Sequence, residues 1–239
     1  MNFLFLEEIS STNKYAKENI KTLEDFTVVH AGVQTAGRGR MNRKWISNTG
    51  DNLYASIVLK PSNELREVYA NLTQYLSLII SNVIEEYGLK PDIKWPNDVR
   101  INGKKICGIL AESVIEKNGL KGIILGFGVN LNCKKEEIEK IDQPATSLNI
   151  ETGMEINKEI FLKKVVNMFC LRYNKFIEDG FLLIREDYIR RAEFLNKPIT
   201  VRVFDKEISG IAQDITDNGA LKLIDKNNKE HVLLIGDIL

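Results

Sequence analysis

The spacing of apolar residues changes late in the chain, and this change constrains the fold more than any other feature of the sequence. In the first part, residues 65–84 and 157–177 repeat apolar side chains at the spacing of a buried helix face. In the last part, from 199 to 234, only short β-type runs separated by turns occur. The sequence therefore predicts two units, a larger one over 1–195 and a small β-barrel over 196–239.

Strands and shorter helices are predicted between the two long helices. The predicted strands of the larger unit are 3–6, 26–31 and 53–59, a strand within 93–99 that breaks into a loop, and a long hairpin from 106–115 and 120–131. The predicted strands of the last part are 199–204, 208–214, 220–224 and 231–234, and shorter helices are predicted at 14–20 and 182–194. We expect Ser62 or Asn63 to cap the first long helix and Ile160 to face inward from the second.

Charge and cysteine content exclude several classes of protein. The chain has 33 basic and 33 acidic residues, so bulk attraction to nucleic acid or to an anionic membrane is not expected. Cys107, Cys133 and Cys170 are far apart, which argues against a disulfide framework and predicts a cytoplasmic location. No signal-peptide pattern and no run of about 18 apolar residues occurs, so no membrane partner is expected.

Common catalytic motifs are also missing from the sequence. His30 and His231 are the only histidines, too few for a histidine-based metal site, and we expect no resident metal. Neither a GxSxG nucleophile elbow nor a GxxxxGK[ST] phosphate loop is present. A serine hydrolase or a P-loop enzyme is therefore not expected.

Residues 37–45, Gly-Arg-Gly-Arg-Met-Asn-Arg-Lys-Trp, carry the strongest chemical signal. The glycines let the backbone approach a ligand closely, and Arg38, Arg40 and Arg43 offer forked donors for a phosphate or a carboxylate. The segment is typical of an anion-binding loop. By its residues alone, a solvated basic loop or an RNA-binding Arg-Gly tract explains it equally well.

The segment 94–98, Lys-Trp-Pro-Asn-Asp, presents polar side chains where a predicted strand ends. Its proline imposes an extended or turning backbone on itself and on the preceding tryptophan. Lys94, Asn97 and Asp98 are thereby presented at a strand end, a favoured place for binding sites. A surface turn with a buried tryptophan explains the segment as well.

Two further strands carry groups that could act on a ligand. Strict alternation places Lys105 and Cys107 on one face of their strand and Ile106 on the other. The run 126–130, Gly-Phe-Gly-Val-Asn, permits close approach to its backbone, and Asn130 could bind a ligand through its amide. Each of these signals is weak alone: a solvated strand edge explains Lys105 as well, and a small core residue explains Cys107.

In their order and spacing, these segments resemble the biotin protein ligases, also called biotin–[acetyl-CoA-carboxylase] ligases. The matching blocks are Ser11-Thr12-Asn13, Gln34 to Trp45, Lys94 to Asp98, Lys105 to Leu110, Gly126 to Asn130, and Ala145 to Leu148 followed by Glu151-Thr152-Gly153. These blocks span nearly the whole chain. The combination of the GRGR loop with KWPND is specific to the family.

The resemblance implies an α+β fold, in which a mixed β-sheet flanked by helices, related to class II aminoacyl-tRNA synthetases, precedes a small SH3-like β-barrel. It implies an ATP-dependent ligase that activates biotin as biotinyl-5′-AMP, releases pyrophosphate and transfers biotin to a lysine. ATP and Mg²⁺ are the implied cofactors. The implied partner is a biotin carboxyl carrier domain of acetyl-CoA carboxylase or a related carboxylase.

The resemblance also implies roles for single residues. The implied catalytic residues are Lys105 as the transition-state cation, Arg40 beside the reacting groups, and Asp98 as acceptor or orienter of the lysine proton. The biotin site is implied to contain Ser11, Thr12, Asn13, Gln34, Gly37, Arg38, Gly39, Arg40, Lys105 and Gly108. The ATP site is implied to contain Arg38, Arg40, Arg43, Trp45, Lys94, Asn97, Asn130 and Ala145.

The chain departs from the family pattern within the GRGR loop. Asn42 stands where glycine is usual, and Met41 stands where an arginine is common. Asparagine tolerates a positive φ better than most residues, so we expect the loop to keep its shape with one anion contact fewer. A catalytically inactive relative is therefore a second hypothesis.

The residues are also compatible with a lipoate or related carboxylate ligase on the same fold, and with a non-catalytic RNA-binding protein. Some members of the family carry an N-terminal winged helix-turn-helix that binds DNA. Here the catalytic pattern begins at once, so no DNA partner is expected. A homodimer through sheet edges is the assembly we consider.

Overall fold

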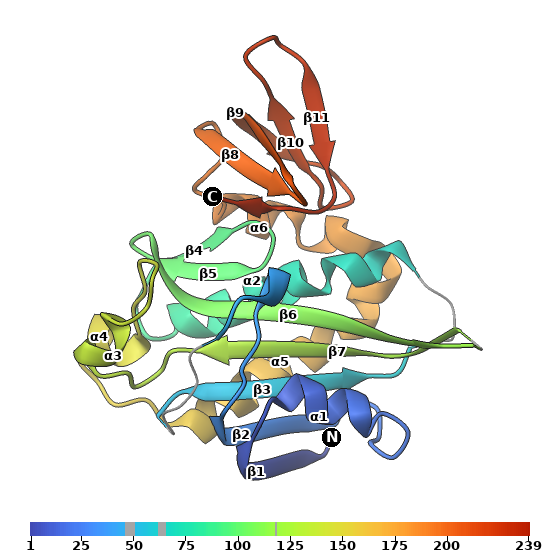
Figure 1. The fold of residues 1–239 in the computed structure, drawn as a ribbon, viewed down its shortest axis with the longest axis vertical. Coiled ribbons are helices and arrows are strands. Elements are labelled where there is room, and N and C mark those ends of the chain that lie inside the picture. The colour runs from blue at the N-terminus through green and yellow to red at the C-terminus, as the bar shows by residue number, and fades with distance from the viewer. Residues whose placement is uncertain (46–50, 62–65, 118) are drawn as a thin grey trace.

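The computed structural model describes residues 1–45, 51–61, 66–117 and 119–239. A seven-stranded mixed sheet forms its larger part (Figure 1). In spatial order the strands are β1 (Phe3–Ile9), β2 (Val28–Gln34), β3 (Leu53–Leu59), β7 (Gly119–Val129), β6 (Lys104–Glu116), β5 (Asp98–Ile101) and β4 (Pro91–Lys94). The pair β1–β2 is parallel, and the other neighbouring pairs are antiparallel. The mixed sheet and the predicted long hairpin, β6–β7, are both confirmed.

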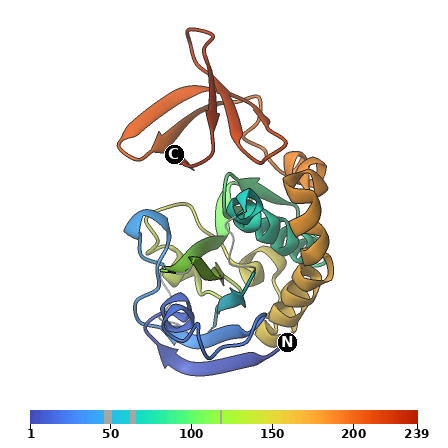
Figure 2. The ribbon, with the colours of Figure 1, turned by 90° about the vertical axis from the view of Figure 1, so that its right-hand side faces the viewer.

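Helices cover both faces of this sheet (Figure 2). On one face lies α1 (Thr12–Glu18), above a small core that includes Ala16 and Val29. On the opposite face, α2 (Leu72–Glu85) and α5 (Lys158–Asp179) pack against each other over the main core. The shorter helical elements are η1 (Arg40–Asn42), η2 (Glu67–Asn71), α3 (Lys135–Ile138), α4 (Leu148–Thr152), η3 (Gly180–Leu183) and α6 (Arg185–Arg190). Within the described ranges, no helix is long and apolar enough to cross a membrane.

Helix boundaries differ from the prediction in two places. The first long helix begins at Leu72 because the preceding turn, η2, is a 3₁₀ helix whose Val68 still enters the core, so the apolar spacing continues across the change of helix type. The expected caps Ser62 and Asn63 lie outside the described residues. The segment 182–194 contains η3 and α6 instead of one helix.

Two residues face other directions than predicted. Ile160 is 52% exposed, because Phe161 and Leu162 take the inner positions of the first turn of α5. In β6, Ile106 and Cys107 both lie in the main core, although strict alternation predicted opposite faces. The cause is a register shift: Val99 pairs with Cys107 while Arg100 pairs with Lys105, so Ile106 has no partner opposite it in β5.

The last part of the chain forms a separate antiparallel sheet of five strands. In spatial order they are β11 (Glu230–Leu233), β10 (Leu221–Ile224), β9 (Lys206–Ile215), β8 (Pro198–Val203) and β12 (Asp237–Ile238). The four predicted strands are present, and β12 was not predicted. This sheet is the small all-β unit that the spacing and the resemblance indicated.

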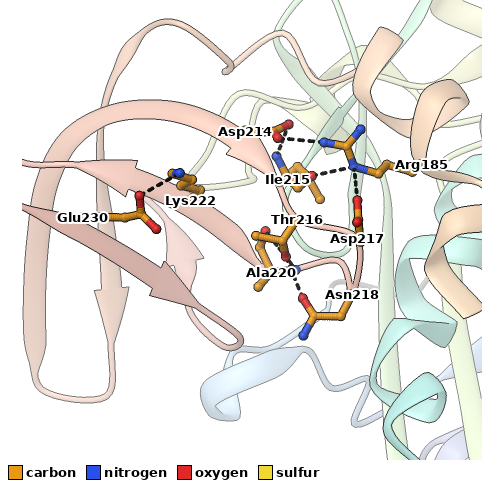
Figure 3. A network of polar contacts seen from close by, with 9 residues as sticks. All are labelled: Arg185, Asp214, Ile215, Thr216, Asp217, Asn218, Ala220, Lys222 and Glu230. Atoms are coloured by element: carbon orange, nitrogen blue, oxygen red, sulfur yellow. Dashed lines mark hydrogen bonds and ion pairs between the residues drawn. The ribbon is translucent and has the colours of Figure 1, made fainter.

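A turn between β9 and β10 attaches the C-terminal sheet to α6 (Figure 3). Arg185 of α6 lies 2.7 Å from the Asp214 carboxylate and 3.3 Å from that of Asp217. Within the turn, the Thr216 hydroxyl donates to Asn218 Oδ1 at 2.6 Å. These contacts attach the turn to α6.

The same turn contacts the KWPND segment. Trp95 Nε1 donates to the Gly219 carbonyl at 3.2 Å, and Gln74 Nε2 donates to the same oxygen at 2.9 Å. Trp95 is buried, so it is a structural anchor between the two sheets. The neighbouring polar residues of KWPND are therefore fixed close to the C-terminal sheet.

Candidate active site

A cleft opens on the face of the seven-stranded sheet that carries α1. It is lined from α1, the loop after β2, the β4–β5 turn, the central strands β6 and β7, and β12 of the C-terminal sheet. The structure brings most of the predicted site residues together in this lining: Ser11, Thr12, Asn13, Gln34, Arg38, Gly39, Arg40, Arg43, Trp45, Lys94, Asn97, Asp98, Lys105 and Gly108. Segments from both ends of the chain thus form one site.

Three predicted site residues lie outside the lining and support it. The Gly37 carbonyl accepts a hydrogen bond from Trp45 N at 3.0 Å, which closes the GRGR loop at its base. The Asn130 amide donates to the Thr146 carbonyl at 3.0 Å, and Ala145 pairs with Lys105 in a parallel bridge. The Asn130 amide and the backbone of Ala145 thus hold the segment around Ala145 beside β6.

One end of the cleft carries neutral hydrogen-bonding groups. The Ser11 hydroxyl accepts from Lys14 N at 3.5 Å and caps α1, which places the buried Thr12 at the start of the helix. Gln34 Oε1 accepts from Thr12 N at 2.8 Å and from the Thr12 hydroxyl at 3.1 Å. The buried Ser56 of β3 donates to Asn13 Oδ1 at 2.6 Å. This end suits an uncharged polar ring.

Two glycines of β7 make room for these groups. A Cβ at Gly126 would lie 1.9 Å from Asn13 Oδ1, and a Cβ at Gly128 would lie 2.5 Å from Trp45 Cε2. Neither distance is compatible with a side chain. The GxGxN run is therefore the floor of the cleft, with Asn13 and Trp45 lying directly on its backbone.

The GRGR loop, residues 37–45, folds over the cleft as a short closed turn. Arg38 and Lys44 pair in an antiparallel bridge at its base. At the tip, Met41 adopts a φ of 52°, in the left-handed region. The positive φ that we expected Asn42 to accommodate thus falls on Met41, a strain of about 1–3 kcal/mol that the rest of the loop sustains.

The opposite end of the cleft is cationic. Lys105 Nζ lies 2.8 Å from Asp98 Oδ2, with each side chain 17% exposed. The same ammonium lies 5.5 Å from the centre of the Trp45 ring, within cation–π range. Burial lowers the pKa of the nearby Lys94, an effect that the charge of Asp98 opposes. Positive charge is thus concentrated where water is scarce, which strengthens its action on an anion.

Arg40 connects the GRGR loop to the C-terminal sheet. Its Nη1 lies 2.9 Å from Asp237 Oδ1 in β12 and donates to Asn97 Oδ1 at 3.2 Å. Arg43 Nη2 lies 3.5 Å from the other Asp237 oxygen. The Asn97 amide in turn donates to the Ile109 carbonyl at 2.7 Å. Three segments distant in sequence therefore orient one guanidinium.

Sequence reasoning assigned no role to Asp237, which lines the cleft, or to Ser56 and Glu112, which contact its lining residue Asn13. Ser56 was detectable as the one polar residue within an apolar strand, Leu-Tyr-Ala-Ser-Ile-Val-Leu. Glu112 contacts Asn13 from β6, in a strand with no unusual spacing. Asp237 belongs to a strand of two residues, which leaves no periodic signal.

The arrangement can hold a small molecule with an uncharged polar ring at one end and anionic groups at the other. Cations at the second end would screen a carboxylate that approaches a phosphate. Among the residues that the structure describes, no group of three or more His, Cys, Asp or Glu side chains could hold a metal ion.

Comparisons with known proteins agree with this chemistry. Residues 5–130 match the Biotin/lipoate A/B protein ligase family, and residues 194–239 match the Biotin protein ligase C terminal domain. The chain is 34% identical over 226 residues to the Biotin–[acetyl-CoA-carboxylase] ligase of Paracoccus denitrificans, covering 91% of this chain and 92% of that protein. It is 33% identical over 225 residues to the Bifunctional ligase/repressor BirA of Bacillus subtilis, covering 93% of this chain and 69% of that protein.

A solved structure agrees as well. The biotin protein ligase from Aquifex aeolicus in complex with biotin and ATP superposes with a TM-score of 0.84 at 28% identity, covering 100% of this chain and 97% of that chain. The α+β fold implied by the sequence blocks is confirmed by this match. Its sequence, its fold and the residues that line its cleft show that the chain belongs to the biotin protein ligase family.

Proposed function

We propose that this chain attaches biotin to a lysine of a carrier protein in two steps within the one cleft. One observation carries the proposal: a neutral polar pocket adjoins the Lys105–Asp98 pair and Arg40 in a member of the biotin protein ligase family. The Aquifex aeolicus relative was solved with biotin and ATP, and the Paracoccus denitrificans relative is named for acetyl-CoA carboxylase.

In the first step, the ureido ring of biotin binds at Thr12, Asn13 and Gln34, and its tail runs along the floor of the cleft towards Lys105. A carboxylate oxygen attacks the α-phosphorus of ATP, the bond to the bridging oxygen breaks, and pyrophosphate leaves. The approach brings two anions together, so Lys105 and Arg40 supply the positive charge that stabilises the transition state. Closure of the GRGR loop protects the mixed anhydride from water.

Mg²⁺ enters this scheme on the phosphates of ATP, as part of the substrate. Asp98 and Asp237 are the carboxylates in the described lining, and a Lys or Arg side chain already engages each of them. Two separate, paired carboxylates do not form a resident metal site. Arg38, Arg43 and Lys94 are the further cations that we assign to the triphosphate.

In the second step, the amine of a carrier lysine attacks the acyl carbon of biotinyl-5′-AMP, and AMP leaves. A free lysine has a pKa of about 10.4, so its amine must lose a proton before it attacks. We assign the acceptance or orientation of that proton to Asp98, whose carboxylate lies 2.8 Å from Lys105 Nζ in the same cleft. Lys105 thus acts in the activation of biotin, and Asp98 acts in its transfer to the carrier lysine.

The carrier partner, the cellular location and the assembly of the protein belong to the same proposal. The partner is a biotin carboxyl carrier domain of acetyl-CoA carboxylase or a related carboxylase. A cytoplasmic location fits the three free cysteines. The unit boundary between 195 and 196 and a homodimer through an edge strand, β1 or β4, stay predictions.

The test is biotinylation of a purified carrier domain. The protein is incubated with biotin, ATP, Mg²⁺ and the carrier, and intact mass spectrometry follows the carrier. We expect one biotin per carrier and none on a carrier whose acceptor lysine is replaced by arginine. Modification by lipoate in place of biotin would change the substrate, and no modification by folded protein would overturn the proposed function.

A further inference from the structure

Glu112 lies outside the lining of the cleft, yet it contacts the lining residue Asn13. Its Oε2 accepts a hydrogen bond from Asn13 Nδ2 at 2.9 Å, and its Oε1 lies 2.8 Å from Lys17 Nζ. Burial opposes ionisation of this carboxyl, and the hydrogen bonds from Lys17 and Asn13 outweigh it, so the pKa of Glu112 is lowered. Glu112 is therefore a carboxylate, a group that accepts hydrogen bonds and does not donate them.

This carboxylate decides which way the Asn13 amide points. Asn13 Nδ2 donates to Glu112 and, at 3.3 Å, to the Leu110 carbonyl, so both amide protons face acceptors. The amide oxygen is turned the other way, towards Ser56 Oγ at 2.6 Å. Rotating the amide by half a turn would place its oxygen against the Glu112 carboxylate, an acceptor against an acceptor.

The orientation of the Asn13 amide determines where the hydroxyl protons of Ser56 and Thr12 point. Ser56 has one hydroxyl proton, and Asn13 Oδ1 takes it. Ser56 Oγ also lies 2.8 Å from Thr12 Oγ1, which lies 3.1 Å from Gln34 Oε1. The hydroxyl proton of Thr12 then points to Ser56 Oγ or to Gln34 Oε1, and Thr12 Oγ1, which lines the cleft, keeps a lone pair that can accept from a ligand. A ureido ring, which presents two N–H groups, needs acceptors there.

From this chain of contacts we infer that Glu112, held by Lys17, is a positioning residue that fixes the donor and acceptor pattern of the biotin pocket through Asn13. The inference rests on the proposed function, because the ligand is biotin. It assigns selectivity for a ureido N–H donor to a side chain that the ligand does not touch.

The test uses the pyrophosphate–ATP exchange assay and the variant Glu112→Gln. Glutamine has the same size, but its amide can donate or accept, so only the longer contact with the Leu110 carbonyl, at 3.3 Å, still orients the Asn13 amide. We expect the KM for biotin to rise on the order of tenfold, the effect of one hydrogen bond to a charged group, with the KM for ATP unchanged. Lys17→Met should move the KM for biotin in the same direction by less.

Glu116→Gln is the matched control. Glu116 lies on the same strand and pairs at 3.2 Å with Lys21, in the segment after α1, and neither residue lines the cleft. We expect its kinetic constants to equal those of the parent. Equal changes in kcat and in both KM values for Glu112→Gln would indicate a structural role and overturn the inference, and so would an unchanged KM for biotin.

A rescue variant separates orientation from stability. Asn13→Asp alone places two carboxylates together and should weaken biotin binding more than Glu112→Gln. The double variant Asn13→Asp/Glu112→Gln exchanges donor and acceptor between these two positions and keeps an oxygen towards Ser56, although the Leu110 carbonyl loses its donor. It should bind biotin more tightly than Asn13→Asp alone. If it binds no better, the inference is wrong. Failure of the parent protein to catalyse biotin-dependent exchange would instead refute the proposed function.

Discussion

Replacing Lys105 by methionine should abolish most of the adenylation activity. The ammonium lies 2.8 Å from Asp98 Oδ2, and its side chain is 17% exposed, in the part of the cleft where the carboxylate and the α-phosphate would meet. A unit charge about 4 Å from the developing negative charge contributes about 4 kcal/mol at an effective dielectric constant near 20. Since 1.36 kcal/mol corresponds to a factor of ten in rate, the exchange rate should fall by about a thousandfold.

The assay is biotin-dependent exchange of labelled pyrophosphate into ATP. Lys104→Met is the control, because Lys104 is exposed on the same strand, and it should exchange at the parent rate. Loss of Lys105 leaves the Asp98 charge unpaired, so the double variant Lys105→Met/Asp98→Asn should recover thermal stability without recovering exchange. Folded Lys105→Met protein that exchanges within about threefold of the parent would refute the assigned role.

Asp237→Asn removes the charge that holds Arg40 at 2.9 Å, so the loop should close less well and AMP should be released about tenfold faster in a reaction without carrier, as chromatography of the products would show. Gly126→Ala places a Cβ 1.9 Å from Asn13 Oδ1, which costs about 1–3 kcal/mol of overpacking. The KM for biotin should therefore rise and the KM for ATP stay unchanged. A variant that binds biotin as tightly as the parent would contradict the placement of Asn13 on the Gly126 backbone. The lowered pKa of Lys94 means that its charged form opposes folding at neutral pH, an opposition that disappears as pH rises from the folded pKa to the unfolded value near 10.5. Lys94→Met should therefore unfold at a higher temperature than the parent at pH 7, with the difference shrinking towards pH 10; a difference independent of pH would be contrary to this account.

The main elements of the fold could be predicted because their apolar patterns are long. The hairpin β6–β7 and the two long helices each carry many residues at one period. The strand β12, with two residues, exists only because it pairs with β8, and no local pattern marks it. The bulge at Ile106 likewise depends on the partner strand β5, so alternation along β6 alone misplaced Cys107.

The site could be predicted as a set of residues but not as a set of contacts. Short blocks named most of the lining, because each block must place particular side chains on a particular backbone. The pairing of Arg40 with Asp237 joins the loop after β2 to the last strand of the chain, and no pattern around either residue predicts the other. Asn130 shows the opposite case. Its motif is conspicuous and predicted a ligand contact, but its amide donates to the backbone carbonyl of Thr146.

The central claim is that this cleft activates biotin by joining it to AMP. Pyrophosphate–ATP exchange by the purified protein with Mg²⁺, run with biotin, with lipoate and with no acid, tests it most directly. The account predicts exchange with biotin and background rates in the other two reactions. Exchange with lipoate alone, or no exchange by folded protein with either acid, would contradict it.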